Sequence, residues 1–160
     1  MEEDQKKDIA QFLSNVPPFS VLSEERLINV AEITTIEQYP ARHKLFSYGD
    51  SGDKLYIIRD GKIRVGREIP GMGEEAFAVL GEGSYFGELS LIDEQPRSAD
   101  AHVHTTCTLL SITHTDFEEL LMLNQQLAYE ILWEFCRILS KRLRETDEKF
   151  TMLNAASKFE

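Results

Sequence analysis

The sequence YFGELSLIDEQPRSADAHV, residues 85–103, places a short helical segment between two strand-like runs. Gly87 and Glu88 open that segment, and Arg97 with Ser98 follows it. A packed apolar core has no use for a carboxylate and a guanidinium, whereas a small anion that carries hydroxyl groups would use both. The stretch therefore predicts a ligand site at a break between strands.

Each polar residue of this stretch suits one part of such a ligand. Backbone N–H groups at the start of a helical turn carry partial positive charge, and Gly87 has no side chain to keep an anion away from them. Glu88 can accept hydrogen bonds from sugar hydroxyls, while Arg97 and the Ser98 hydroxyl can donate to phosphate oxygens. With apolar neighbours, this set indicates a nucleotide. The alternative is a surface ion pair between Glu88 and Arg97, which would contribute only about 0–1 kcal/mol.

Residues 33–114 around this stretch have the pattern of a β-sheet domain. Short runs rich in Val, Ile, Tyr, Phe and Thr alternate with turn sequences such as GDSGD at 49–53 and PGMG at 70–73. Asp60-Gly61 is the strongest hairpin signal, because a type I′ turn needs positive φ at both central residues. This spacing predicts an antiparallel sandwich or barrel, so the expected fold class is mainly β with flanking helices (α+β).

Helical patterns flank the strands on both sides. Residues 1–32 carry apolar side chains at helical spacing and predict packing helices, and residues 115–160 are helical again. Asn124 is a suitable N-cap for a long helix over 124–153. Seven positions of this helix repeat at alternating steps of four and three, which is the spacing of a coiled-coil seam. They are Leu132, Cys136, Leu139, Leu143, Thr146, Phe150 and Leu153.

This seam predicts a homodimer through the long helix. Ile131, Phe135 and Ile138 lie beside the seam, where they can hold the helix to its own barrel. The alternative is one broad apolar face that packs entirely within the monomer. A helix of about 45 Å extends well beyond what a single barrel would cover, which favours the dimer.

Composition limits the classes to which this chain can belong. A length of 160 residues suits one domain, and 42% hydrophobic residues is ordinary for a globular fold. The formal net charge of −11 argues against nucleic-acid binding, which needs a basic face. No stretch approaches the ~18 apolar residues of a membrane span, and the charged start, MEEDQKKDIA, lacks the apolar region of a secretory signal. We therefore expect a cytoplasmic protein that binds neither nucleic acid nor membrane.

The motif FGELSLIDEQPRSA resembles the phosphate-binding cassette of the cyclic nucleotide-binding domain family, in which F-G-E-[LI]-[AS]-L is followed by P-R-[AST]-A. Residues 49–65, GDSGDKLYIIRDGKIRV, are similar to the family's glycine-acid turn and tyrosine-centred strand. The resemblance covers roughly residues 15–153. It implies an eight-stranded antiparallel β-roll of jelly-roll type over 33–114, with the cassette at 86–99. It also implies cyclic AMP or cyclic GMP as a ligand inside the roll, and no other cofactor.

The same resemblance implies a role for each cassette residue. Gly87 and Leu89 match the family's backbone and apolar contacts, and Glu88 matches the acceptor for the ribose 2′-hydroxyl. Arg97 and Ser98 match the ligands of the cyclic phosphate. Three apolar residues match positions near the base: Val65, Phe77 and Leu80.

Residues 141–149, KRLRETDEK, resemble the long helix of bacterial catabolite activator proteins. Arg142 matches a basic residue that approaches the ligand, and Thr146 matches a threonine that contacts the adenine amino group. Asp147 stands where those activators have a serine that reaches the base from the partner subunit. A carboxylate there can pair with guanine, whereas Ser98 favours cyclic AMP, because the family's kinases use threonine at that position for cyclic GMP. We expect cyclic AMP, with cyclic GMP as the alternative.

The expected function is a sensor that signals to a protein partner through its C-terminal helix. It is not expected to be an enzyme, because no nucleophile with a base and no pair of carboxylates placed for acid–base work is legible. The chain after Leu153 is too short for the helix-turn-helix of the activators, so either a stand-alone sensor or a piece of a longer protein is expected. A structural or dimerisation module without a ligand is the alternative function.

Asp100, His102 and His104 alternate along the sequence and therefore share one face of a strand. Histidines at this spacing can ligate zinc, but a third and a fourth ligand are not evident. The small apolar residues between them suit an inward face, which leaves the polar trio on the outside. We therefore expect a solvated polar surface here and no metal site.

Overall fold

The computed structural model describes residues 2–157, apart from the side chains of Glu74 and Ala76. Helical elements come first: α1 (Glu3–Leu13), the 3₁₀ turn η1 (Phe19–Val21) and α2 (Glu24–Glu32). Within the described residues, six strands and a short helix follow: β1 (Thr35–Tyr39), β2 (Lys44–Phe46), β3 (Lys54–Ile69), β4 (Gly73–Leu80), β5 (Tyr85–Phe86), α3 (Glu88–Asp93) and β6 (Asp100–Thr113). The last two helices are α4 (His114–Leu123) and α5 (Gln125–Ala156).

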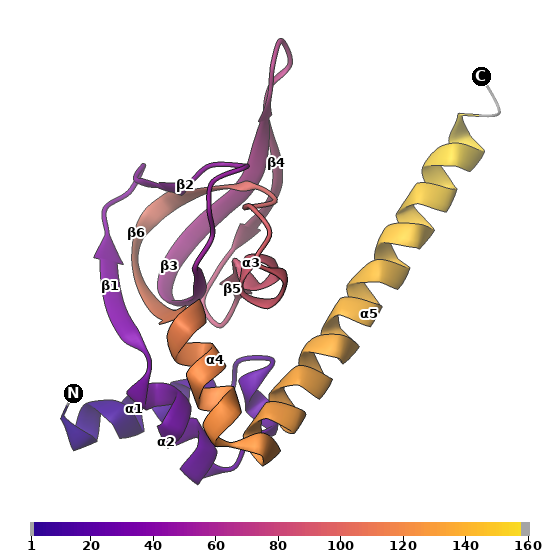
Figure 1. Cartoon of the computed structure of the whole chain (residues 1–160). Coiled ribbons are helices and arrows are strands. Elements are labelled where there is room, and N and C mark those ends of the chain that lie inside the picture. Colours follow the sequence, from indigo (N-terminus) through magenta and orange to yellow (C-terminus); the bar gives the residue numbers. More distant parts are fainter. Residues whose placement is uncertain (1, 158–160) are drawn as a thin grey trace.

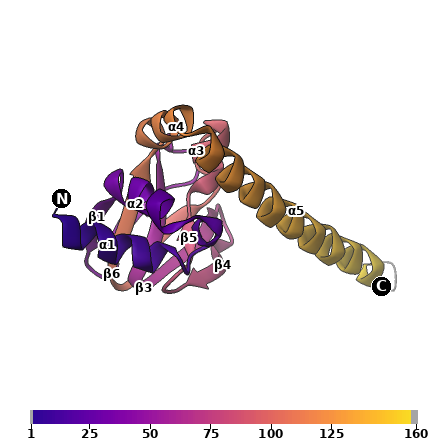
Figure 2. The same cartoon turned by 90° about the horizontal axis from the view of Figure 1, so that it is seen from below.

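The strands form one antiparallel sheet in the order β1-β6-β3-β4, with β2 added to β6 and β5 added to β3. The sheet curls into a roll, and α1, α2 and α4 gather at one end of it (Figure 1). α5 starts at the same end and projects away from the roll (Figure 2). The predicted class, mainly β with flanking helices, is confirmed.

The described residues form six strands, where the family resemblance implies eight. The difference comes from β3 and β6, which run without interruption for 16 and 14 residues. β6 pairs with β1, β2 and β3, so a single bent strand serves several parts of the roll. Irregularities in the strand pairing let such long strands bend with the sheet without ending.

The type I′ hairpin predicted at Asp60-Gly61 is wrong. The residues on both sides of Gly61 pair with β6 and not with each other, so the chain does not reverse there. Instead, the pairing register shifts between Ile58 and Ile63, which is typical of β-bulges. Gly61 has a φ of 90°, and a β-carbon there would lie 2.5 Å from the carbonyl oxygen of Thr106. Glycine is needed here for a bulge packed against β6, not for a turn.

Two apolar cores hold the chain together. The first packs the helices against the sheet and includes Ile9, Leu13 and Phe19 from the N-terminal segment. The second fills the inside of the roll, with Ile58 and Ile63 fully buried on either side of the bulge. None of the described helices combines the length and the apolar character that a membrane crossing requires.

α5 buries side chains against the rest of the chain only in its first part. Ile131 and Phe135 are buried in the first core, as predicted. From residue 140 onward every described residue of α5 is exposed, including the seam residue Leu143 at 62% and Phe150 at 65%. The alternative in which the whole apolar face packs within the monomer is therefore excluded.

Candidate functional site

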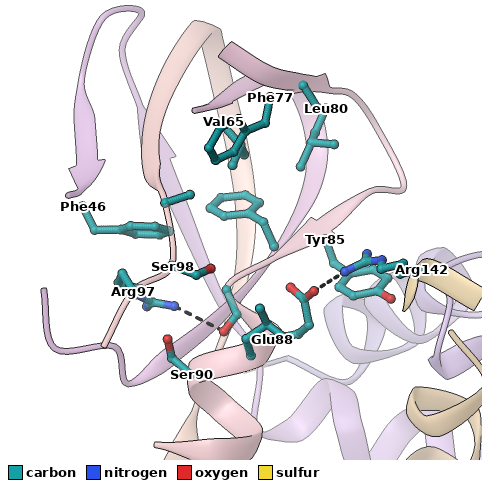
Figure 3. A pocket seen from close by; sticks show the side chains of 15 residues that line it. Phe46, Val65, Phe77, Leu80, Tyr85, Glu88, Ser90, Arg97, Ser98 and Arg142 are labelled. Carbon is teal, nitrogen blue, oxygen red and sulfur yellow. Dashed lines mark hydrogen bonds and ion pairs between the residues drawn. The ribbon is translucent and has the colours of Figure 1, made fainter. Parts of the chain in front are cut away.

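A cavity of about 410 Å³ opens between the roll and α3, and α5 reaches its mouth (Figure 3). Its volume lies in the range of pockets that take small-molecule ligands. Nine of the residues predicted from the sequence line it: Val65, Phe77, Leu80, Gly87, Glu88, Leu89, Arg97, Ser98 and Arg142. Six further residues line it that were not predicted: Phe46, Ala78, Tyr85, Phe86, Ser90 and Ala99.

Gly87 opens α3 in a left-handed conformation, with a φ of 81°. A β-carbon at this residue would lie 2.5 Å from Nη1 of Arg97 and 2.9 Å from the carbonyl oxygen of Lys54. Gly52, in the turn before β3, also lies directly against Arg97: a β-carbon added at this residue would lie 2.7 Å from Nε of Arg97. Both positions need glycine so that the backbone can close around the arginine.

Arg97 is a buried cation, with only 4% of its surface exposed. Its Nη1 donates to the carbonyl oxygen of Gly87 at 3.2 Å, and its guanidinium lies 4.2 Å from the centre of the Phe46 ring. Among the described residues no carboxylate forms an ion pair with Arg97, and its Nε has no hydrogen-bond acceptor. Burial lowers the pKa of Arg97, but a guanidinium keeps its charge in proteins. An anion in the cavity would supply the missing counter-charge.

The backbone around Arg97 is held by the 49–53 turn. The Arg97 N–H donates to the carbonyl oxygen of Asp50 at 2.8 Å, and the Gly49 N–H donates to the carbonyl oxygen of Arg97 at 2.8 Å. These two bonds fix the segment against the turn that precedes β3. Ser98, the next residue, lines the cavity as a result.

Glu88 is the second buried charge of the site and forms an ion pair with Arg142. The Arg142 side chain is 47% exposed, and its guanidinium lies 5.4 Å from the centre of the Tyr85 ring. Because Glu88 belongs to α3 and Arg142 to α5, the pair connects the cassette to the long helix (Figure 3). A carboxylate has several acceptor positions, so Glu88 can accept a ligand hydroxyl in addition to the arginine.

The wall opposite these charges is apolar. Val65 on β3 and Leu80 on β4 face the cavity, and Phe77 is 56% exposed at its rim. Three aromatic residues of the cavity lining were missed from the sequence: Phe46, Tyr85 and Phe86. Tyr85 and Phe86 stand directly before Gly87, so their position in the chain offered a signal. Phe46 offered none, because it reaches the site through the curl of the sheet.

Thr146 and Asp147 are not brought to the cavity within a single chain. Both lie on the exposed part of α5, and the Thr146 hydroxyl donates to the carbonyl oxygen of Arg142 at 2.9 Å. Arg142, one helical turn earlier, is the last α5 residue that lines the cavity. A ligand contact by Thr146 or Asp147 therefore needs a movement of α5 or a second chain.

The solvated surface predicted for Asp100, His102 and His104 is wrong for Asp100. The Asp100 carboxylate is buried and accepts the backbone N–H groups of Tyr48 at 2.8 Å and Glu68 at 3.0 Å. Burial alone would raise the pKa of Asp100, but these hydrogen bonds outweigh it and lower the pKa. Asp100 thus ties the loop after β2 and the end of β3 to the start of β6. In the described part of the chain, no three His, Cys, Asp or Glu side chains are grouped to hold a metal ion.

Comparisons with known proteins agree with this geometry. The family model of the cyclic nucleotide-binding domain matches residues 36–124. The cyclic AMP receptor protein of Thermus thermophilus is 35% identical over 116 residues, which are 72% of this chain and 52% of that protein. The cGMP-dependent protein kinase egl-4 of Caenorhabditis briggsae is 30% identical over 98 residues, 61% of this chain and 13% of that protein. This chain thus spans about half the length of the receptor protein.

A solved structure shares the fold over most of both chains. The N-terminal domain of a transcriptional regulator from Streptomyces coelicolor A3(2) is similar with a TM-score of 0.74 and 31% identity, covering 87% of this chain and 94% of that one. The matched family region, 36–124, contains α3, Arg97 and nearly all of the sheet. The chain therefore belongs to the cyclic nucleotide-binding domain family.

Proposed function

We propose that this chain is a cyclic nucleotide sensor that binds its ligand in the cavity between the roll and α3. Arg97 carries the proposal, because it is buried beside the cavity and has no ion-pair partner among the described residues. Glu88 is already balanced by Arg142, so the site holds one positive charge in excess. A cyclic phosphodiester carries one negative charge and would balance it.

The proposed pose follows the distribution of polar and apolar groups. The phosphate oxygens would accept from Arg97 and Ser98, and the ribose 2′-hydroxyl would donate to Glu88. Gly87 and Leu89 would border the sugar and phosphate. The base would lie on the apolar wall, which includes three residues from β3 and β4: Val65, Phe77 and Leu80.

The ion pair between Glu88 and Arg142 offers a route from the ligand to α5. A ribose hydroxyl on Glu88 would share the carboxylate with Arg142, so the position of α5 would depend on whether ligand is bound. The exposed part of α5 can then present a different surface to a protein partner in the two states. This is a regulatory role without catalysis, and we propose it for a protein of the cytoplasm.

We further propose a homodimer in which the exposed seams of two α5 helices pack together. α5 has 32 residues, about 48 Å of helix, and its outer part carries the exposed apolar residues Leu143, Phe150 and Leu153. In such a pair, Thr146 and Asp147 of one chain would approach the base in the cavity of the other. A second chain would thus bring Thr146 and Asp147 to a cavity, whereas they do not line the ligand site of their own chain.

Cyclic AMP is the proposed ligand, and cyclic GMP is the second candidate. Ser98 and the similarity to a cyclic AMP receptor protein favour cyclic AMP. Asp147 and the similarity to a cGMP-dependent protein kinase favour cyclic GMP, because a carboxylate can accept the two adjacent N–H groups of guanine.

Calorimetric titration of the whole chain with cyclic AMP, cyclic GMP and 5′-AMP tests the proposal. We expect one cyclic nucleotide to bind most tightly, and 5′-AMP to bind at least about tenfold more weakly because its second negative charge finds no counter-charge. No heat with either cyclic nucleotide, together with an unchanged melting temperature, would overturn the proposal. A dimerisation module without a ligand would then be the favoured function.

A further inference from the structure

Arg142 is placed so that it can bind a second carboxylate. Its guanidinium pairs with Glu88 at the mouth of the ligand cavity, yet 47% of the side chain stays exposed (Figure 3). A guanidinium carries five N–H donors in a planar fork, so a pair with one carboxylate leaves donors free. Arg142 therefore has donors left for a group that approaches from the solvent side.

The seam of α5 determines which residues flank a helix that packs on it. In heptad notation the seam residues alternate between a and d, with Leu143 at a and Thr146 at d. Arg142 comes directly before Leu143 and so occupies a g position, and Asp147 comes directly after Thr146 and occupies an e position. Residues at g and e lie on the two sides of the seam, where they contact the partner helix.

Two parallel helices in register pair each g residue with the e residue of the partner's next heptad. For Arg142 that residue is Asp147 of the partner subunit. Asp147 is exposed and, among the described residues, forms no ion pair within its own chain. No opposite charges meet at the two neighbouring g–e pairs: Phe135 with Ser140, and Lys149 with Asn154. Arg142 and Asp147 thus carry the charge complementarity of the seam.

The same two residues disfavour an antiparallel dimer. Antiparallel helices pair g with g and e with e, so Arg142 would face Phe135, Lys149 or a second Arg142, and never Asp147. Like charges at these positions select against an arrangement. The charge pattern therefore favours the parallel dimer, and in that dimer the partner's carboxylate lies beside Arg142 at the mouth of the cavity.

We propose that Asp147 of the partner subunit completes the mouth of the cyclic nucleotide cavity by forming an ion pair with Arg142. The inference rests on the proposed homodimer and deepens it, because each chain then supplies a charged group to the ligand site of the other. Arg142 lies between two carboxylates, Glu88 of its own chain and the partner's Asp147.

This position of Arg142 couples ligand binding to dimer formation. A ribose hydroxyl that donates to Glu88 competes with Arg142 for the carboxylate, so the guanidinium transfers hydrogen bonds to the partner's Asp147. Ligand binding then tightens the dimer. By thermodynamic linkage, dimer formation tightens ligand binding by the same factor.

Sedimentation equilibrium of Asp147→Lys without ligand tests the ion pair. We expect its dimer dissociation constant to rise at least about tenfold, because a lysine then faces Arg142 on each side of the seam. Glu148→Lys is the matched control. It makes the same change of charge one residue later, at an f position that points away from the seam, and should leave the dimer unchanged. Asp147→Glu keeps the carboxylate and should remain close to the wild type.

Arg142→Gln identifies the group that Asp147 contacts. In this background Asp147→Lys and Glu148→Lys should change the dimer dissociation constant by the same factor. Equal dissociation constants for Asp147→Lys and Glu148→Lys when Arg142 is intact would overturn the proposal. A selective effect of Asp147→Lys that persists in Arg142→Gln would overturn it as well. A monomeric wild type would overturn the proposed homodimer and this inference with it.

The same measurement with saturating cyclic AMP, and separately with cyclic GMP, tests the coupling. The nucleotide that binds should lower the dimer dissociation constant of the wild type at least about fivefold, and that of Asp147→Asn by a smaller factor. A nucleotide that binds in calorimetry but leaves the wild-type dimer unchanged would overturn the coupling. If neither nucleotide binds, the proposed ligand is wrong, and the lysine variants still decide whether the ion pair forms in the unliganded dimer.

Discussion

Lys54 on β3 donates a 2.8 Å hydrogen bond to Glu37 on β1, although β6 lies between these two strands in the sheet. The intervening strand contributes Ser111, whose hydroxyl donates to the same Glu37 oxygen at 2.6 Å, and the Tyr39 hydroxyl donates to the other oxygen. One carboxylate thus collects donors from three strands. It also anchors the strand behind the cassette, because the carbonyl oxygen of Lys54 packs directly against Gly87.

The free energy of unfolding should therefore decrease in acid as Glu37 is protonated. Burial alone would raise the pKa of Glu37, but hydrogen bonds from Lys54, Ser111 and Tyr39 outweigh it and hold the pKa below its ordinary 4.5. A carboxyl with a lowered pKa stabilises the fold above the unfolded-state value, and this contribution is lost as pH falls through the folded-state value. Urea denaturation of the wild type should show stability falling below about pH 4.5, with a shallower fall in Glu37→Gln. Equal slopes in the two proteins would contradict this prediction.

Gly87→Ala should destabilise the chain more than the same change at Gly83. The two glycines have φ values of 81° and 76°, so each variant places a β-carbon on left-handed backbone at a cost of about 1 kcal/mol. Only at residue 87 does that carbon meet Arg97, at 2.5 Å from Nη1, whereas nothing lies within 4 Å at residue 83. We expect a further loss of about 1–3 kcal/mol for Gly87→Ala in urea denaturation. If both variants lose the same amount, the arginine moves aside without cost.

Arg97→Met should weaken ligand binding severely with little loss of stability. Methionine keeps an apolar side chain over Phe46 and removes a buried cation that has no ion-pair partner among the described residues. Calorimetry with the cyclic nucleotide should show a loss of about 2–4 kcal/mol, while the melting temperature shifts by less than about 4 °C. Arg59→Met is the matched control. Arg59 forms an ion pair with Asp8, with 2.5 Å between the charged atoms, and does not line the cavity, so its loss should leave the affinity unchanged. Unchanged affinity in Arg97→Met would exclude this cavity as the binding site.

Local signals in the sequence predicted much of the fold. The cassette concentrates Gly87, Glu88 and Arg97 in one short stretch, and Asn124 caps α5 as predicted by accepting the N–H of Leu127 at 3.1 Å. Predictions failed where a distant strand decides the outcome. Asp60-Gly61 has the residue types of a hairpin turn, but the residues on both sides of Gly61 pair with β6, so the segment forms a bulge.

The surroundings of the site depend on contacts that the sequence does not encode locally. The ion pair between Glu88 and Arg142 joins residues 54 positions apart. The aromatic ring over Arg97 belongs to Phe46 on β2, far from it in the sequence. The buried Asp100 carboxylate accepts from two backbone donors that are distant in sequence, one in the loop after β2 and one at the end of β3. Such contacts follow from the curl of the sheet and from the direction of α5, so residue types alone could indicate the chemistry of the cavity but not its walls.

Leu143→Glu should convert the proposed dimer into a monomer that remains folded. Leu143 is 62% exposed in the single chain, so a charge there does not disturb either core, but on the seam of a dimer it would be buried without a counter-charge. Sedimentation equilibrium should give a dimer for the wild type and a monomer for Leu143→Glu. Met122→Glu is the matched control, because it places the same charge at a 71% exposed residue of α4, and it should remain a dimer. If Thr146 contacts the base of the ligand bound in the other chain's cavity, the monomer should also bind cyclic AMP more weakly than the dimer does. Adding Arg97→Met to this monomer should weaken the remaining binding further. A dimeric Leu143→Glu would place the contact between chains elsewhere, and a monomeric wild type would exclude the dimer. In either case Thr146 and Asp147 could reach the ligand only by a movement of α5.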